Sequence, residues 1–388
     1  MIWFLWISGI ALALIWLVPV IDTALHIHLI ADLTKPEWAP PDSIRLPSLT
    51  IVVPARNEEH EVEEALRSLL ALDYPEIEVI VVNDRSTDTT GAIMERISAA
   101  EAGSKQRLRT IHVRELPRRW LGKTHAMWRG AQQANSDWVL FTDADCVFRS
   151  DTMRRAMFYA VKNSLDHLVL IPTIHMHSLG ERMMIAFPQI AASFIMRPWK
   201  VRDQEARDFI GAGAFNLVRR EAYNAIGTFA ALRLEIVDDL KLGEMIKKAR
   251  FRQDVVIGRD LVSLRWIRGA MGLVRNLEKN LFAFLRFRLS LVIAACILLL
   301  FLNVWPFVGT IIAPGWARAP FAFAVAMIAV RYYQGSATIG VPTITFLLNP
   351  ISAILTGFAI LGSAFAAIRN GGVTWRGTKY PLDELRKK

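Results

Sequence analysis

The stretch Leu49-Thr-Ile-Val-Val-Pro-Ala-Arg-Asn-Glu-Glu59 decides the fold. Its first five residues are apolar or β-branched, and a turn-forming, polar run begins at Pro54. A short apolar run that ends in turn residues is typical of a strand buried on both faces of a sheet. Such strands belong to mostly parallel sheets, whose faces are covered by helices. The stretch therefore predicts an α/β protein.

Four similar runs follow downstream and alternate with helical stretches. The pattern predicts strands over Leu49 to Val53, Ile77 to Asn83, Leu108 to Val113, Trp138 to Thr142 and Leu168 to Ile171. It predicts helices over Asn57 to Leu70, Asp88 to Ala102, Thr124 to Ala134 and Asp151 to Lys162. This alternation indicates a mostly parallel sheet with right-handed crossovers. Ligands bind beyond the carboxyl ends of the strands in such sheets, so candidate site residues follow each strand.

Outside this region the chain is strongly apolar. The 388 residues are 53% hydrophobic, and no charged residue occurs between Met1 and Ile21, between Arg288 and Arg318, or between Arg331 and Arg369. A helix needs about 20 apolar residues to cross a bilayer, so the sequence predicts a membrane protein. The first segment could be a signal peptide, but it has no basic n-region. We interpret residues 1–21 as a retained transmembrane anchor.

The C-terminal apolar segments leave the topology open. We expect spans over Leu289 to Ile312 and Thr343 to Ile368, and a weaker one over Ala319 to Ile339 that Arg331 interrupts. Basic residues favour the cytoplasmic side, and they occur both before residue 289 and in the tail, residues 369–388. The residues concerned are Arg275, Lys279, Arg286 and Arg288, and then Arg369, Arg376, Lys379, Arg386, Lys387 and Lys388. Three spans would place these two basic groups on opposite sides of the membrane, although both favour the cytoplasmic side. We therefore favour one re-entrant or interfacial segment, which leaves two or three spans within residues 289–368.

The net charge and the number of cysteines limit the partners and the metal sites that the chain can have. The formal net charge is +10, which in a membrane protein suggests anionic head groups or phosphorylated substrates and no nucleic acid. Cys146 and Cys296 are the only cysteines, so a disulfide framework and a cysteine-built zinc site are excluded. These features fit a bacterial-type inner membrane, with the middle of the chain facing the cytoplasm.

Acidic residues follow three of the predicted strands: Glu58 and Glu59 after the first, Asp84 after the second, and Asp143 with Asp145 after the fourth. Carboxylates together with substrate phosphates hold hard divalent cations such as Mg²⁺ or Mn²⁺. Alternate residues of an extended segment point to the same side. One carboxylate of an Asp-x-Asp can therefore bind the metal, while the other contacts the ligands that surround the metal or a ribose. These acids could also be solvated loop residues, but acids that end a buried strand are costly unless paired.

Between Pro54 and Leu242 the chain contains an ordered set of motifs. They are P-A-R-N-E-E, V-N-D-R-S-T-D-T-T, W-L-G-K-T-H-A, T-D-A-D, G-A-G-A-F-N-L-V-R-R-E-A-Y and V-D-D-L-K-L. The ordered set resembles the family 2 glycosyltransferases. The resemblance implies a GT-A nucleotide-sugar domain over residues 48–260. The apolar ends and the tail motif G-G-V-T-W-R-G-T-K-Y resemble members that glycosylate ceramide, hopanoid or carotenoid lipids.

The resemblance also implies roles for individual residues. The nucleotide-sugar would be bound by Pro54, Ala55, Arg56, Glu58, Asp84, Lys123, Asp143 and Arg265. Within this set, Asp84 would accept a hydrogen bond from uracil, and Lys123 would lie near the phosphates. The metal would be held by Asp145, with Asp143 beside it. The sugar and acceptor site would be shaped by Gly211, Gly213 and Asn216.

Asp239, the second acid of Val-Asp-Asp-Leu, would be the general base, with Asp238 in the position of the family's Glu. Two adjacent carboxylates repel each other, which raises one pKa towards a useful value. The alternative is that Asp239 only caps a helix over Leu240 to Lys248. The chain departs from the family pattern at two places. Position 262, three residues before Arg265, is Val where the family has Gln or Arg, and Ala214-Phe215 replace residues that are often Gly or Gln. The second departure makes it unsafe to infer the donor sugar.

Several features have a second interpretation. Arg265 and Arg268 could contact the diphosphate or belong to basic interfacial helices over residues 261–288 that bind lipid head groups. The segment from Met183 to Trp199 could be a core helix or lie in the interface. His175 and His177 alternate after the fifth strand, and we favour a hydrogen-bonding or structural role over metal ligation. Asp88 is expected to cap a helix.

The sequence therefore predicts a membrane-bound, metal-dependent, inverting glycosyltransferase of the hexosyltransferase type, with a nucleotide-sugar donor and a lipid or lipid-linked acceptor. Two alternatives remain. One is a processive polysaccharide synthase of the same fold, against which the small number of spans argues. The other is a non-catalytic membrane scaffold with a degenerate nucleotide-sugar domain, against which the retained acids argue.

Overall fold

The structure is a computed structural model and describes all residues except 1, 42, 102–106, 193, 195, 267, 273, 275–280, 376, 377 and 383–388. The predicted basic residues Arg275, Lys279, Arg376, Arg386, Lys387 and Lys388 lie outside the described residues. The chain divides into two compact units. The sheet unit comprises residues 29–175 and 197–265, and the helical unit comprises residues 1–28, 176–196 and 266–388.

An eight-stranded, mostly parallel sheet forms the centre of the sheet unit, in the order β1-β10-β7-β9-β5-β2-β3-β4. Its strands are β1 (Ala31–Asp32), β2 (Leu49–Ala55), β3 (Ile77–Asp84), β4 (Leu108–Val113), β5 (Trp138–Phe141), β7 (His167–Ile171), β9 (Asn216–Arg219) and β10 (Gln253–Ile257). All five predicted strands are present, and the predicted α/β class is confirmed. The exception to parallel pairing is β9, which runs antiparallel to both β5 and β7.

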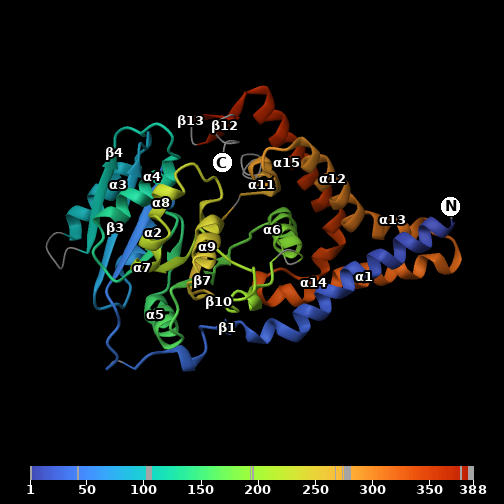
Figure 1. The fold of residues 1–388 in the computed structure, drawn as a ribbon, viewed down its shortest axis with the longest axis horizontal. Helices are drawn as coiled ribbons and strands as arrows, with labels where there is room; N and C mark the ends of the chain where they lie inside the picture. The colour runs from blue at the N-terminus through green and yellow to red at the C-terminus, as the bar shows by residue number, and fades with distance from the viewer. Residues whose placement is uncertain are drawn as a thin grey trace. The chain divides into compact units, whose positions relative to one another are not determined.

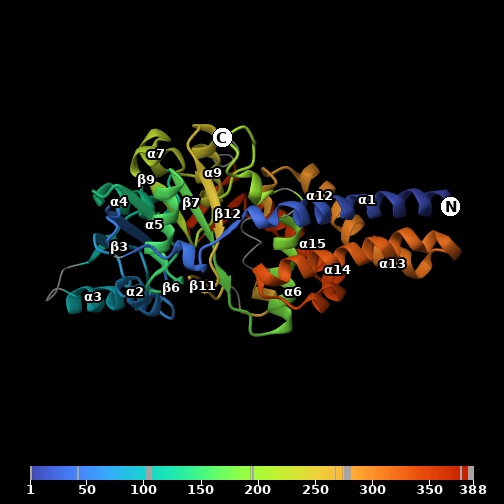
Figure 2. The ribbon, with the colours of Figure 1, turned by 90° about the horizontal axis from the view of Figure 1, so that it is seen from below.

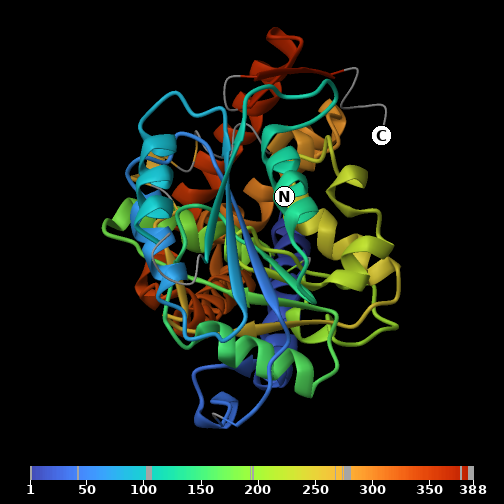
Figure 3. The same ribbon diagram turned by 90° about the vertical axis from the view of Figure 1, so that its left-hand side faces the viewer.

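Helices cover both faces of this sheet because its strands are apolar on both sides. One face packs against α2 (Val62–Leu70), α3 (Thr90–Glu101) and α5 (Thr152–Lys162). The other packs against α4 (Gly122–Gln133), α7 (Arg220–Ala225), α8 (Thr228–Ala231) and α9 (Asp238–Lys248). In β2, Ile51 and Val53 belong to the first core and Val52 to the second, as the alternation of a strand requires. Figure 3 shows α2 and α3 on one side of the strands and α4 on the other.

A second, three-stranded sheet adjoins the carboxyl ends of the central strands. It consists of β6 (Val147–Phe148), β11 (Val262–Leu264) and β8 (Thr173–Ile174), in that order. β6 begins two residues after Asp145 and pairs antiparallel with β11. This small sheet connects the loop after β5 to the segment that ends at Arg265.

The helical unit contains the apolar ends of the chain. Its helices are α1 (Ile2–His26), α6 (Leu179–Ala192), α11 (Leu281–Phe284), α12 (Leu289–Asn303), α13 (Trp305–Ile312), α14 (Ala319–Ile339) and α15 (Asn349–Arg369), followed by the hairpin β12 (Gly372–Trp375) and β13 (Thr378–Pro381). α1, α13 and α14 run side by side (Figures 1 and 2). α12 packs against α15.

Two helical segments of the described residues are long and apolar enough to cross a membrane, Ile2–Leu29 and Thr343–Arg369. A third span is possible if α12 and α13, which meet at a bend of 45°, form one broken span. Length and composition therefore agree with an anchor near the N-terminus and with the expected apolar C-terminal region. α14 does not meet this test, in line with the interruption expected from Arg331. The predicted segment from Met183 to Trp199 includes most of α6, whose buried side chains contribute to the core of the helical unit.

A buried histidine connects three strands of the sheet unit. His167 is fully buried in β7, and its Nε2 lies 3.0 Å from Oδ1 of Asn216 in β9. Its Nδ1 lies 2.6 Å from Nε2 of Gln253 in β10. Burial lowers the pKa of His167 to about 4, so the imidazole is neutral at pH 7.

This burial predicts a pH-dependent loss of stability. Below the ordinary histidine pKa of about 6.5 the unfolded chain takes up a proton that folded His167 refuses, so stability falls between about pH 6.5 and 4. The contribution is on the order of 3 kcal/mol. Guanidinium unfolding of the detergent-solubilised chain at several pH values measures it, with His167→Gln as the non-titrating control. Equal pH slopes for the two proteins would rule out the buried neutral imidazole.

Candidate functional site

The carboxyl ends of β2, β3 and β5 meet at one edge of the sheet because these strands are parallel. Pro54 and Ala55 end β2, Asp84 ends β3, and Asp143 and Asp145 follow β5. The structure thus brings together the residues that were selected from strand ends. The starts of α4 and α9 lie at the same edge and add Lys123, Asp238 and Asp239.

Lys123 is the central cation of this edge. Its Nζ lies 2.7 Å from Oδ1 of Asp143 and 3.9 Å from Oδ2 of Asp238. Burial lowers the pKa of Lys123, but the carboxylates of Asp143, Asp238 and Asp239 outweigh burial and raise it above its ordinary value. The side chain is 15% exposed, so Lys123 is not a solvated surface lysine. The anion next to the start of α4 is, in this structure, the carboxylate of Asp143.

Asp239 is held in a fixed orientation by backbone groups. Its Oδ2 accepts a hydrogen bond from the Gly213 N–H at 2.9 Å, and its Oδ1 accepts one from the Leu240 N–H at 2.8 Å. Asp239 is half-buried, whereas Asp238 is only 5% exposed. The prediction that a helix starts at Leu240 behind an Asp239 cap is wrong in detail: α9 begins at Asp238, and the N-cap position is Val237. Both acids lie in the first turn, where the helix dipole favours negative charge.

Three carboxyl groups of this edge, those of Asp145, Asp238 and Asp239, have pKa values above that of an ordinary aspartate. Burial, with a further contribution from Asp143, raises the pKa of Asp145 to about 6. Burial raises the pKa of Asp238 to about 7, against the opposing effect of Lys123. Burial also raises the pKa of Asp239 above its ordinary value. Charge is therefore crowded here, and a further cation would stabilise the ionised forms.

The small-residue turn over residues 211–214 lies against both Asp143 and Asp239. A Cβ on Gly211 would overlap the backbone carbonyl of Asp239, and a Cβ on Gly213 would lie 2.6 Å from Oδ2 of Asp143 and 3.3 Å from Nζ of Lys123. The Asp143 N–H donates to the Gly213 carbonyl at 3.1 Å. Only glycine allows this approach, so the sequence pattern Gly-x-Gly has a geometric cause here.

Polar side chains behind the turn hold it in place. The Ile210 N–H donates to Oε1 of Gln253 at 2.9 Å, and the Ala212 N–H donates to Oδ1 of Asn216 at 3.4 Å. Asn216 was selected for the sugar and acceptor site, but its side chain is 2% exposed and bonded to His167 and the turn. Its geometry supports the site from behind. Gln253 and His167 were missed, because β10 pairs with β7, and β7 with β9, only in the folded sheet.

Asp84, at the carboxyl end of β3, is a second buried carboxylate of this edge. Arg85 contacts both of its carboxylate oxygens, with distances of 2.8 and 3.2 Å, and Nη1 of Arg56 lies at 3.6 Å. Asp84 is 1% exposed, so these arginines provide its charge compensation. Arg85 was not selected from the sequence, although its position next to Asp84 was visible there.

The loop after β2 is paired with the turn after β3. Glu59 accepts hydrogen bonds from the N–H and the hydroxyl of Thr89, and the Glu58 N–H donates to Oγ1 of Thr90. Asp88 accepts from the N–H groups of Thr90 and Glu59. Asp88 thus accepts from the N–H of Thr90, the first residue of α3, although it lies two residues before the helix begins and not at the expected N-cap position. These contacts hold Glu58 beside the end of β2.

Arg265 directly follows β11, the central strand of the small sheet. β11 pairs with β6 through Val262 with Phe148 and Ser263 with Val147. Asp145 lies in the turn that precedes β6. Arg265 is exposed. Arg268 belongs to the helical unit.

The donor set fits a hard divalent cation in part. No group of three or more His, Cys, Asp and Glu residues able to hold a metal occurs within the part of the chain that the structure describes. Asp143 and Asp145 supply hard oxygen ligands, and burial together with the neighbouring charge of Asp143 raises the pKa of Asp145. A metal at this position would need substrate phosphates or water to complete its shell. His175 contributes a backbone N–H bond to Leu264, consistent with a structural role.

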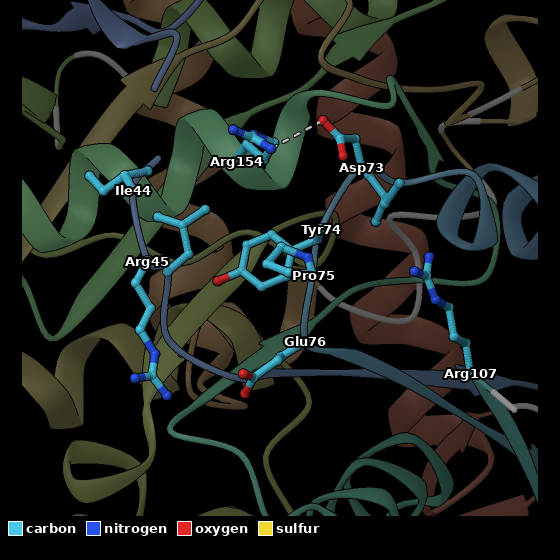
Figure 4. A pocket seen from close by; sticks show the side chains of 10 residues that line it. Ile44, Arg45, Asp73, Tyr74, Pro75, Glu76, Arg107 and Arg154 are labelled. Atoms are coloured by element: carbon cyan, nitrogen blue, oxygen red, sulfur yellow. Dashed lines mark ion pairs between the residues drawn. The ribbon is translucent and has the colours of Figure 1, made fainter. Parts of the chain in front are cut away.

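A half-open pocket lies elsewhere in the sheet unit. It has a volume of about 420 Å³ and lies next to the starts of β2 and β3, the edge opposite the carboxylates. Figure 4 shows Arg45, Arg107 and Arg154 around Tyr74, with Arg154 paired to Asp73 at 3.5 Å. It contains none of the residues selected from the strand ends. We therefore locate the candidate site at the opposite edge of the sheet, called the carboxylate edge, which carries Asp84, Asp143, Asp145, Asp238 and Asp239.

Residues 50–241 match the model of a family described as Glycosyl transferase family 2. Two curated relatives from Staphylococcus aureus are each described as 4,4'-diaponeurosporenoate glycosyltransferase. The protein of strain bovine RF122 / ET3-1 is 26% identical over 197 residues, which are 50% of each chain. The protein of strain MRSA252 is 25% identical over 219 residues, which are 56% of each chain. The chain thus spans about half the length of the curated relatives it matches.

A solved structure resembles the chain more completely. It is a mannosyltransferase from Pyrobaculum calidifontis in complex with GDP-Man and Mn²⁺. The likeness covers 94% of this chain and 98% of that one, with a TM-score of 0.54 and 20% identity. At this identity the likeness concerns the fold, and the expected GT-A architecture is confirmed. Residues 50–241, which carry the carboxylate edge, are a family 2 glycosyltransferase domain.

Proposed function

We propose that the chain is an inverting glycosyltransferase that moves a sugar from a UDP-sugar to a hydroxyl of a lipid or lipid-linked acceptor. The observation that carries the proposal is Asp239, a half-buried carboxylate held by two N–H groups beside Lys123 and Asp143. The apolar segments Ile2–Leu29 and Thr343–Arg369 and the carotenoid-type relatives support a lipid acceptor. The same features support an integral membrane location.

In the proposed reaction Asp239 takes the proton from the acceptor hydroxyl. That oxygen attacks the anomeric carbon from the face opposite the diphosphate, and the bond from that carbon to the diphosphate oxygen breaks. One base is sufficient because inversion in a single step needs no covalent intermediate. Asp239 is suited to this role because its orientation is fixed while one side stays accessible, whereas Asp238 is buried and paired with Lys123. Holding the reactants in line provides a further large part of the rate.

The diphosphate would lie over Asp143, Asp145 and Lys123, with Arg265 as a second cation. Asp145 and Asp143 would hold Mg²⁺ or Mn²⁺, which when bound would neutralise charge that develops on the leaving diphosphate. The Pyrobaculum mannosyltransferase was solved with Mn²⁺ and a nucleotide-sugar, a precedent within this fold. The cationic side chains of Lys123 and Arg265 would also stabilise the negative charge on the leaving diphosphate.

The nucleoside would lie over the part of the carboxylate edge that carries Asp84. Its contacts would be Pro54, Ala55, Arg56, Glu58 and Asp84, and Gly211, Gly213 and Asn216 would shape the sugar and acceptor site. In this arrangement both oxygens of Asp84 already accept from Arg85. A carboxylate oxygen has a second lone pair, so a uracil N–H can still be received.

Incubation of the purified full chain with labelled UDP-sugars, Mn²⁺ and a membrane lipid extract tests the proposal, with mass spectrometry of the lipids as the readout. We expect one labelled sugar per modified lipid. Long sugar chains would indicate a polysaccharide synthase. Absence of any transfer from every nucleotide-sugar, despite nucleotide binding, would indicate a scaffold.

Asp239→Asn tests the base. The amide cannot accept the proton, so we expect the rate to fall by roughly 10²–10⁴-fold while UDP binding persists. The variant also loses one of the two N–H bonds, so thermal unfolding must be measured beside activity. Asp238→Asn is the matched control. If Asp238→Asn is inactive and Asp239→Asn is not, the base is Asp238.

The wild-type pH profile gives an independent check. A base must be ionised, so the rate should fall as the pH drops through its pKa. Because burial raises the pKa of Asp239, that fall should begin above the ordinary aspartate pKa of about 3.8. An acid limb at or below pH 3.8 would contradict the assignment.

We also propose that the domain over residues 48–260 faces the cytoplasm, as the basic flank before residue 289 predicts. Glu221 is 72% exposed, so Glu221→Cys provides a surface thiol in this domain. The thiol should resist an impermeant reagent in intact cells and react after lysis. The unsubstituted protein, whose Cys146 is buried, is the control. Rapid labelling of intact cells would reverse the proposed orientation.

A further inference from the structure

The anchor helix α1 defines the two sides of the helical unit. α1 ends at His26, and the chain enters the sheet unit at residue 29. The C-terminal end of α1 therefore lies on the membrane side that holds the sheet unit, called the near side. Its 25 residues extend about 37 Å, which is enough to cross the hydrocarbon core, and Trp3 then lies on the opposite, far side.

Helix α14 runs in the same direction as α1. A Cβ on Gly9 would meet Pro320 at the start of α14, whereas Arg331 in its second half donates to the Thr23 hydroxyl at 2.8 Å. α14 thus leads from the far half of the unit to the near side. The charge that interrupts α14 lies at its near end, where Arg331 is bonded to Thr23 and Gln334.

Helices α12 and α13 lead in the opposite direction, from the near side to the far side. Residues 266–288, which connect the sheet unit to α12, contain no uncharged run longer than six residues, so they cannot cross the membrane. At the end of α12 the Leu302 carbonyl accepts from the Trp16 indole N–H at 2.9 Å. At the start of α13 the Trp305 indole N–H donates to Oγ of Ser8 at 3.3 Å. α12 and α13 therefore form one broken span.

Helix α15 returns along α12. At its start, Nδ2 of Asn349 donates to Oδ1 of Asn303 at 3.1 Å, at the end of α12. Towards its end, Oγ of Ser363 accepts from the Phe282 N–H of α11 at 3.1 Å. α15 is therefore antiparallel to α12, and its last turns lie beside the near-side segment that precedes α12.

The first turn of α15 also contacts a near-side segment. Oγ of Ser352 donates to the Met183 carbonyl of α6 at 3.2 Å. Residues 176–196, which contain α6, are preceded and followed by the sheet unit. This segment is too short to cross the membrane and return, because two crossings need about 40 residues. Both ends of α15 are thus tied to segments that start from the near side.

The two faces of α15 differ in size and polarity. Its buried face carries small side chains, among them Ser352, Thr356 and Ser363, which allow neighbouring helices to approach closely. Its other face is a row of exposed, large apolar side chains: Ile351, Ile354, Phe358, Leu361, Phe365 and Ile368. α12 exposes Ile293 and Ile297. Such surfaces fit acyl chains, since apolar patches of this extent are rare on surfaces that face water.

We propose that α15 does not cross the membrane and that α12 and α15 embed their exposed apolar rows in the near-side leaflet. α15 has 21 residues and extends about 31 Å, so with both ends on the near side it lies along the leaflet. The basic residues before residue 289 and those of the tail, residues 369–388, then share one side, as the charge bias of membrane proteins favours. This arrangement does not depend on the proposed sugar transfer.

Thiol labelling of intact cells with an impermeant reagent tests which parts share a side. Glu221→Cys marks the sheet unit, Lys388→Cys marks the tail, and Trp316→Cys, at an 84% exposed position, marks the turn before α14. We expect Lys388→Cys to label as Glu221→Cys does and Trp316→Cys to behave oppositely, whichever side is outside. A tail thiol that labels as Trp316→Cys does would overturn the proposal, and so would equal labelling of Trp316→Cys and Glu221→Cys. The unsubstituted protein is the control.

The depth of nitroxide labels in reconstituted bilayers, measured by spin resonance, tests the orientation of α15 directly. Ile354→Cys, Leu361→Cys and Phe365→Cys are labelled one at a time in a Cys296→Ala background. We expect similar depths within one leaflet, whereas a crossing helix would separate the first and last labels by about 16 Å of depth. A separation of that size would overturn the proposal. The matched controls are exposed positions of α1, where the middle label should be the deepest: Ile7→Cys, Leu14→Cys and Ile21→Cys.

Discussion

The ion-paired cluster of Lys123, Asp143, Asp238 and Asp239 is the interaction on which the arrangement of the candidate site depends. One buried ammonium group faces three carboxylates that come from the loop after β5 and from the start of α9. Breaking such a cluster by removal of one partner leaves an uncompensated buried charge. The cluster therefore holds α4, α9 and the Asp-x-Asp loop at one edge of the sheet.

The fold supplies the remaining constraints. Parallel strands bring the ends of β2, β3 and β5 to the same edge, and the antiparallel strand β9 leads out of the glycine turn that receives Asp239. Behind this turn, His167, Asn216 and Gln253 form a chain of buried hydrogen bonds across three strands. A half-buried carboxylate can keep one orientation only because these contacts over-determine the turn. The cost is a set of raised carboxyl pKa values, which a cation or a substrate contact would relieve.

Much of this fold could be predicted because its signals are local. The five strands predicted from apolar runs all occur, and the Asp-x-Asp segment lies at a strand end as expected. The strands β1, β9 and β10 were missed, since their place in the sheet depends on pairing with residues far away in the chain. The start of α9 was misplaced because Asp238 and Asp239 are stabilised by Lys123 and Gly213, and neither contact can be seen in the local sequence.

Calorimetric titration of the full chain with UDP, with and without Mn²⁺, tests the central claim most directly. That claim is that the carboxylate edge binds the diphosphate of a nucleotide together with a divalent cation. The account predicts UDP binding that strengthens with Mn²⁺ in the wild type and in Asp239→Asn, and that loses its Mn²⁺ dependence in Asp145→Ala. UDP affinity that is unaffected by Mn²⁺ in the wild type, or a Mn²⁺ effect that survives in Asp145→Ala, would contradict the account.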